Sequence, residues 1–107
     1  MENLPPQVGS KLHVDVVGDG PAIVLIHGWG LNAGVWHRVV KRLAVNYRVY
    51  TVDLPGFGFS HQCVASDDLA QWSALVVASI PEPAVWLGWS LGGLVVTQIA
   101  LDCPDRV

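Results

Sequence analysis

Residues 85–96, with the sequence VWLGWSLGGLVV, restrict the fold of this chain more than any other segment. Residues 84–89 have the pattern of a buried strand. Residues 91–103 have that of a helix which is apolar on almost every side and stops before Pro104. A strand that passes directly into a helix through glycines predicts a sharp turn, with Ser90 at its apex.

Strand-like and helix-like segments alternate along the rest of the chain. Residues 11–17 alternate polar and apolar, as in a half-exposed strand, whereas residues 22–26 are continuously apolar, as in a strand covered on both faces. Further elements are expected as an amphipathic helix at 34–46, a strand at 48–53 and a helix at 66–80 opened by a Ser/Asp cap. This alternation predicts an α/β fold in one domain over residues 1–107, with a mostly parallel sheet and helices on both faces.

Composition excludes several classes of function. A hydrophobic content of 51% with 14% charged residues is typical of a compact protein, and a net charge of -3 without a basic cluster argues against nucleic-acid binding. The chain shows no signal-peptide pattern and no apolar run of the roughly 18 residues that span a bilayer, so we expect a cytoplasmic protein without membrane contact. Cys63 and Cys103 lack metal-ligand spacing, which predicts reduced thiols and no metal site.

Ser90 is the candidate nucleophile. Gly88, Ser90 and Gly92 form a G-x-S-x-G pattern, in which glycines let the strand and helix approach while the hydroxyl is presented free of its neighbours. Two glycines in a first helical turn cost roughly 1 kcal/mol each relative to alanine, so the close approach must offset that loss. The alternative is that Ser90 only caps the helix, because serine is a favoured N-cap residue.

Two backbone amides are candidates for binding an oxyanion. The amide of Leu91 would lie at the helix N-terminus, where unpaired N–H groups and the helix dipole favour negative charge. A second donor is expected from the loop after the strand at 22–26, and the amide of Trp29 is the candidate in HGWG. The Trp29 ring could line an acyl pocket.

The same loop also fits a different class of protein. Gly28-x-Gly30-x-x-Ala33 follows a strand, precedes a helix and has Asp53 twenty residues beyond, which is the outline of a dinucleotide-binding module. Against this alternative, the bulky Trp29 stands between the two glycines, where a pyrophosphate would have to approach.

Other polar residues are expected to have structural roles. His27 and Asp53 are predicted to hold loops by hydrogen bonds, and Asp102 and Asp105 lie too far along the last helix to reach Ser90, about 18 Å away at 1.5 Å per residue. The remaining histidines, expected to be solvated or structural, are His13, His37 and His61.

Three blocks, HGWGLNAGVW, VDLPGFGFS and WLGWSLGGLVVTQIAL, together resemble the α/β-hydrolase superfamily. More narrowly, the chain from about Ile23 to Val107 resembles the family of pimeloyl-[acyl-carrier protein] methyl ester esterases of biotin synthesis. Tryptophan in both HGWG and GWSLGG narrows the resemblance to this family.

The resemblance implies a cofactor-independent carboxylesterase that hydrolyses the methyl ester of a pimeloyl chain on acyl-carrier protein. Ser90 would attack the ester, and the amides of Trp29 and Leu91 would hold the oxyanion. A hydrolase of other small esters, lactones or C–C bonds, and a non-catalytic interaction domain, stay open as alternatives.

The chain departs from the family's pattern after Ser90. In this fold the catalytic residues follow the order Ser, Asp, His, but no histidine occurs in the seventeen residues after Ser90. We therefore expect the N-terminal part of a hydrolase domain. By itself it should lack turnover, and it should associate through an unpaired strand edge.

Overall fold

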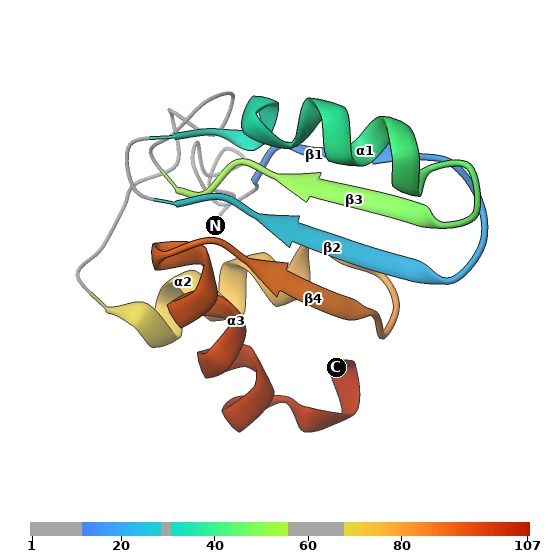
Figure 1. Cartoon of the computed structure of the whole chain (residues 1–107). Coiled ribbons are helices and arrows are strands. Elements are labelled where there is room, and N and C mark those ends of the chain that lie inside the picture. Colours follow the sequence, from blue (N-terminus) through green and yellow to red (C-terminus); the bar gives the residue numbers. More distant parts are fainter. Residues whose placement is uncertain (1–11, 29–30, 56–67) are drawn as a thin grey trace, which may run out of the picture.

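The computed structural model describes residues 12–28, 31–55 and 68–107 (Figure 1). The strands are β1 (Val14–Val17), β2 (Ala22–Ile26), β3 (Arg48–Val52) and β4 (Val85–Gly88). The helices are η1 (Ala33–Trp36), α1 (His37–Leu43), α2 (Leu69–Ala78), α3 (Leu91–Asp102) and η3 (Pro104–Arg106), where η marks a 3-10 helix.

The four strands form one mostly parallel sheet in the order β1-β3-β2-β4. β2 is parallel to both β3 and β4, with Val24 opposite Tyr50 and Ile26 opposite Gly88, whereas β1 is antiparallel to β3. α1 lies over one face of the sheet, and α2 and α3 lie over the other (Figure 1). The predicted α/β architecture is therefore confirmed.

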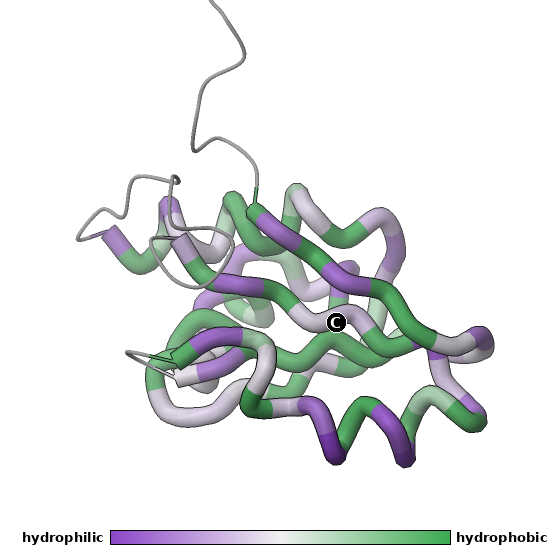
Figure 2. The backbone as a smooth tube through the Cα atoms, turned by 90° about the horizontal axis from the view of Figure 1, so that it is seen from above, coloured by the Kyte–Doolittle hydropathy of each residue, from purple (hydrophilic) through white to green (hydrophobic). Residues whose placement is uncertain are grey.

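The sheet separates two hydrophobic cores. Val24 and Ile26 of β2 point to the larger core, which α2 and α3 complete with Val76, Val95 and Ile99. Leu25, the residue between them, points to a smaller core with Trp36 and Val49 beneath α1. β2 contributes to both cores because successive side chains of a strand face opposite sides. Figure 2 shows long hydrophobic stretches through the sheet, whereas β1 alternates hydrophilic and hydrophobic residues, and further hydrophilic residues lie in turns and along the helices.

The helix expected at residues 34–46 differs from its prediction. It begins as the 3-10 turn η1 and continues as the seven-residue α1, and Val35 and Val39 of the expected apolar stripe are exposed. Two hydrogen bonds fix this start: the Asn32 side chain accepts the amide of Gly34, and the Asp53 carboxylate accepts the amide of Ala33. The tighter turn changes the phase of the helix, so that Trp36 faces the core in their place.

The helix expected at residues 66–80 is shorter than predicted. α2 starts after Asp68, whose side chain caps the helix by accepting the amide of Ala70 at 2.9 Å. The acidic part of the predicted cap is confirmed. The expected start at Ser66 lies outside the described residues.

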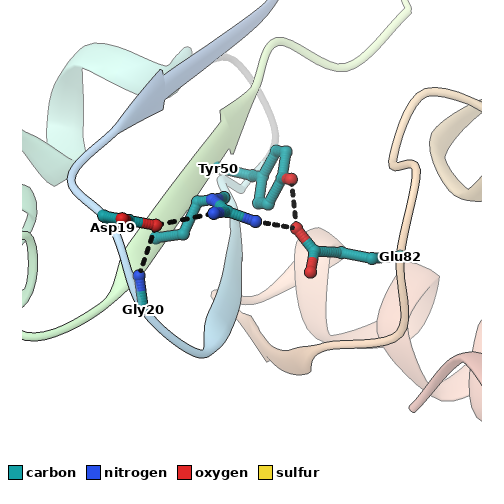
Figure 3. Close-up of polar contacts among 5 residues, drawn as sticks. Asp19, Gly20, Tyr50 and Glu82 are labelled. Carbon is teal, nitrogen blue, oxygen red and sulfur yellow. Dashed lines mark hydrogen bonds and ion pairs between the residues drawn. The ribbon is translucent and has the colours of Figure 1, made fainter.

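A polar cluster ties together the amino ends of the parallel strands (Figure 3). Arg48, the first residue of β3, donates to Asp19 at 2.6 Å and to Glu82 at 2.9 Å, and the Tyr50 hydroxyl donates to the same Glu82 oxygen at 2.5 Å. The hydrogen bonds from Tyr50 and Arg48 lower the pKa of Glu82. The cluster joins the β1–β2 turn to the segment before β4, at the end of the sheet opposite Ser90.

Candidate active site

Ser90 occupies a strained corner between β4 and α3. Its backbone has φ 55° and ψ -114°, and it is the one residue other than glycine with positive φ among those that the structure describes. Such a conformation costs of order 1–3 kcal/mol and persists only where the surroundings impose it. Although Ser90 stands at the N-cap position, its side chain makes no capping hydrogen bond. The capping alternative is therefore wrong, and the side chain is exposed.

Two glycines allow this corner to form. A β-carbon on Gly88 would lie 2.3 Å from the carbonyl oxygen of Gly92, and one on Gly92 would lie 2.3 Å from the carbonyl oxygen of Ile26. Both distances are far below van der Waals contact. A β-carbon on Gly93 would lie 3.6 Å from the nearest atom, so the third glycine is not needed for space.

In the first turn of α3, one amide has no acceptor within the described ranges. Gly92 donates to the carbonyl of Trp89 at 2.8 Å and Gly93 to that of Ser90 at 2.9 Å, whereas the amide of Leu91 has no hydrogen bond to any residue that the structure describes. An amide in this position next to the Ser90 hydroxyl can stabilise a developing negative charge. The other candidate donor, Trp29, lies outside the described residues.

The indole of Trp89 lies against the backbone of Gly28. A β-carbon on Gly28 would be 2.6 Å from Trp89 Cδ1, and the amide of Trp89 donates to the carbonyl of Ile26 at 2.9 Å. The ring thus occupies the space beside Gly28 that a pyrophosphate would need in the dinucleotide alternative. This contact could not be predicted from the sequence, because the motif does not show which way the Trp89 ring points.

His27 is locked by two hydrogen bonds to backbone. Its Nε2 accepts the amide of Leu54 at 2.9 Å, so the ring proton is on Nδ1, which donates to the carbonyl of Gly28 at 2.7 Å. The ring is fully buried, and this desolvation lowers the pKa of His27. Because Nε2 is engaged, a neutral His27 has no free nitrogen lone pair to act as a base. The predicted loop-holding role is confirmed.

Asp53 makes a reciprocal link between the same two loops. Its buried carboxylate accepts the amide of Ala33 at 2.7 Å, while His27 of the first loop accepts from Leu54 of the second. These bonds hold the loop after β2 to the loop after β3. The predicted structural role of Asp53 is confirmed.

The other polar candidates that the structure describes have partners or positions away from Ser90. His13 pairs with Asp15 at 3.1 Å beside β1, His37 is exposed at the start of α1, and Asp102 accepts a hydrogen bond from Gln98 at the end of α3. His61 lies outside the described residues. Within the described ranges no group of three His, Cys, Asp or Glu could hold a metal ion, and no helix is long and apolar enough to cross a membrane.

A groove of about 700 Å³ lies between β1 and the start of α1. Of its lining residues, Asp15 and Thr51 come from β1 and β3. Asn32 precedes η1, and His37 is the first residue of α1. Neither Ser90 nor Leu91 lines it, so this groove is not the predicted acyl pocket.

Comparison with known proteins identifies the family. The sequence model described as the alpha/beta hydrolase fold matches residues 21–107, which include β2, the Ser90 corner and α3. The chain belongs to the α/β hydrolases. In this family the strand-turn-helix at Ser90 is the expected site of a nucleophile.

Several curated relatives of this α/β hydrolase carry one name. The pimeloyl-[acyl-carrier protein] methyl ester esterase of Vibrio parahaemolyticus is 52% identical over 94% of this chain and 39% of its own length. That of Yersinia enterocolitica is 48% identical over 91% of this chain and 38% of its own length. The chain thus spans about two-fifths of the length of the relatives it matches.

Solved structures share the fold. The structure of Est816, titled as an N-acyl homoserine lactone degrading enzyme, matches with a TM-score of 0.83 and 31% identity, over 90% of this chain and 39% of its own. A hydrolase from Pseudomonas aeruginosa matches with a TM-score of 0.80 and 27% identity, over 89% of this chain and 38% of its own.

Proposed function

We propose that this chain supplies the nucleophile and oxyanion-binding part of a serine carboxylesterase that hydrolyses the methyl ester of pimeloyl-[acyl-carrier protein] in the cytoplasm. The observation that carries the proposal is the corner at Ser90. There a hydroxyl that makes no capping hydrogen bond stands on strained backbone, next to the amide of Leu91, which has no acceptor among the described residues. The names of relatives that are about half identical to this chain support the substrate and the carrier protein.

The reaction would proceed by acyl transfer. Ser90 Oγ attacks the ester carbonyl, methanol leaves, and water then hydrolyses the acyl-enzyme to release the pimeloyl chain as a carboxylate. The amide of Leu91 would bind the oxyanion together with that of Trp29. Loss of one such donor typically lowers the rate by about 10²- to 10³-fold.

The proton of Ser90 needs an acceptor that the described residues do not supply. Both nitrogens of His27 are engaged with backbone, and Asp102 lies at the far end of α3. The chain alone is therefore proposed to lack turnover, and a general base would come from a segment equivalent to the part of the relatives that the chain does not span.

A chimera tests this function. The matched segment of the Vibrio parahaemolyticus relative is replaced by this chain, and methanol release from methyl pimeloyl-[acyl-carrier protein] is measured. We expect hydrolysis that falls to background in Ser90→Ala, whereas Ser79→Ala, which alters a hydroxyl at the end of α2, retains it. Activity that survives Ser90→Ala would overturn the proposed nucleophile.

Substrate preference separates the alternatives. The chimera could hydrolyse p-nitrophenyl acetate or an acyl homoserine lactone but not the carrier-bound methyl ester. In that case the hypothesis of a small-ester or lactone hydrolase replaces the proposed methyl esterase. The Ser90→Ala variant is the control in each assay.

A further inference from the structure

The groove between β1 and α1 has no part in the proposed esterase site, because Ser90 does not line it. Its volume is about 700 Å³, and pockets that hold small molecules typically measure about 300–1,000 Å³. Asp15 and Thr51 belong to the sheet side of the groove, and His37 and Val40 belong to the α1 side. The groove is therefore large enough for a small organic molecule.

Thr51 brings a hydroxyl without a partner to this groove. The residue is 6% exposed, and its hydroxyl forms no hydrogen bond with any residue that the structure describes. Among those residues, the fully enclosed side-chain atoms without a partner are Nε1 of Trp36 and Nε of Arg106. The Thr51 oxygen is not one of them, so it reaches the surface, and the surface that Thr51 meets is the groove. Because buried polar groups are normally hydrogen-bonded, this hydroxyl is a candidate contact for a ligand.

Two carboxylates make the groove negative. Asp15 is opposite Thr51 in the register of β1 and β3, so their β-carbons are roughly 4.5–5.5 Å apart on one face of the sheet. Asp53 lies two residues beyond Thr51, on the same side. The described residues that line the groove include both carboxylates and His37 but no lysine or arginine, and outside the groove His13 pairs with Asp15 at 3.1 Å. This charge favours a cationic ligand.

Hydrogen bonds hold the wall of the groove before α1 in place. The buried Asp53 carboxylate accepts the amide of Ala33 at 2.7 Å, and the side-chain oxygen of Asn32 accepts the amide of Gly34 at 2.8 Å. The second bond leaves the NH₂ group of Asn32 as a donor, and Asn32 lines the groove. A wall that is fixed before binding lowers the ordering cost that a ligand would otherwise meet.

We propose that this groove binds a small hydroxylated primary amine of the amino-sugar type, with its ammonium group at Asp15 and Asp53 and a hydroxyl group at Thr51. An ammonium group carries three donors, and a carboxylate such as that of Asp53 can accept more than one hydrogen bond. Val17 and Val40, which also line the groove, would contact the carbon skeleton. A metal ion fits less well, because no group of three His, Cys, Asp or Glu within the described ranges could hold one.

Ligand-observed saturation-transfer NMR with the full chain tests the proposal. The probe is D-glucosamine at pH 7, and N-acetyl-D-glucosamine is the matched control, because it keeps the ring hydroxyls but lacks the ammonium charge. We expect glucosamine to bind with a Kd of about 1 mM or below, and the acetylated sugar to bind at least tenfold more weakly. Absence of a signal from glucosamine, or equal binding of the two sugars, would overturn the proposal.

Two substitutions locate the bound amine. Thr51→Val removes the hydroxyl and keeps a side chain that suits a strand, and Asp15→Asn removes a charge at an exposed position of β1. Each is expected to weaken glucosamine binding at least tenfold. The matched controls are Thr97→Val on α3 and Asp105→Asn in η3, both at exposed positions, and both should bind glucosamine as the wild type does.

The result with Asp15→Asn decides the location even where Thr51→Val is destabilised. Unchanged binding in Asp15→Asn, or an equal loss in Asp105→Asn, would place the amine elsewhere on the protein and overturn the proposal. The assay contains no ester and the variants leave Ser90 intact, so failure of the proposed esterase function would not change its outcome.

Discussion

Gly92 packs so closely on Ile26 that a β-carbon would lie 2.3 Å from the Ile26 carbonyl oxygen. This contact joins the first turn of α3 to the end of β2, and the same carbonyl accepts the amide of Trp89. The corner that carries Ser90 is thus fixed against the strand from which the His27 loop begins.

Gly92→Ala is expected to destabilise the protein by about 1–3 kcal/mol, because the added methyl group meets backbone that cannot move aside. Gly93→Ala is the matched control, since its β-carbon would have ordinary contacts and alanine favours a helix by up to about 1 kcal/mol. Urea unfolding followed by circular dichroism gives both values. Similar midpoints for the two variants would contradict the packing described for Gly92.

A glycine at position 90 is expected to relieve the backbone strain and so raise stability, although the substitution also removes the hydroxyl. At φ 55° glycine is unstrained and alanine is not, so Ser90→Gly should be about 1 kcal/mol more stable than Ser90→Ala. Thermal unfolding of the two variants measures the difference. If Ser90→Ala is the more stable, the corner is not strained.

His27 is expected to make stability depend on pH. Its folded pKa lies below the ordinary value of 6.5, so its contribution is fully present above about pH 6.5 and is lost as pH falls toward the folded pKa. The loss should approach at most about 1.4 kcal/mol per pH unit. Urea unfolding between pH 7.5 and 5 should show this slope in the wild type and in His37→Asn, an exposed control, but not in His27→Asn.

Glu82 is expected to make the stability of the protein depend on pH in a more acidic range than His27 does. The Tyr50 hydroxyl and Arg48 lower its folded pKa below 4.5, so the stability it contributes is present above that pH and is lost as pH falls through the folded pKa. Glu82→Gln should lower the melting temperature at pH 7 and weaken its decrease below pH 4.5. Asp105→Asn, an exposed change in η3, should leave both unchanged.

The core strands and the Ser90 corner could be predicted because their signals are local. The continuous apolar run of β2 marks a strand covered on both faces, and the Gly88 and Gly92 spacing marks a place where a strand and a helix touch. Trp29 as an oxyanion donor remains a prediction, since it lies outside the described residues.

The features that were missed depend on residues far apart in the sequence. The 3-10 start of the helix after β2 depends on Asp53, twenty residues away from its partner Ala33. Arg48 meets Glu82 across 34 residues, and no local pattern indicates that pairing. The contact of Trp89 with Gly28 likewise follows from how β4 and β2 are placed in register.

The two bonds to the carbonyl of Arg106 close β4, the Ser90 corner and α3 into a single loop of chain that is fastened at both ends. A helix anchored in this way is restrained from moving along its axis, which would otherwise relieve the strain at Ser90, the residue just before the helix. The hydroxyl of Ser90 is therefore kept in place partly by contacts sixteen residues further along the chain. Weakening the contacts of η3 should relax the backbone at Ser90, although no residue of the corner itself is changed.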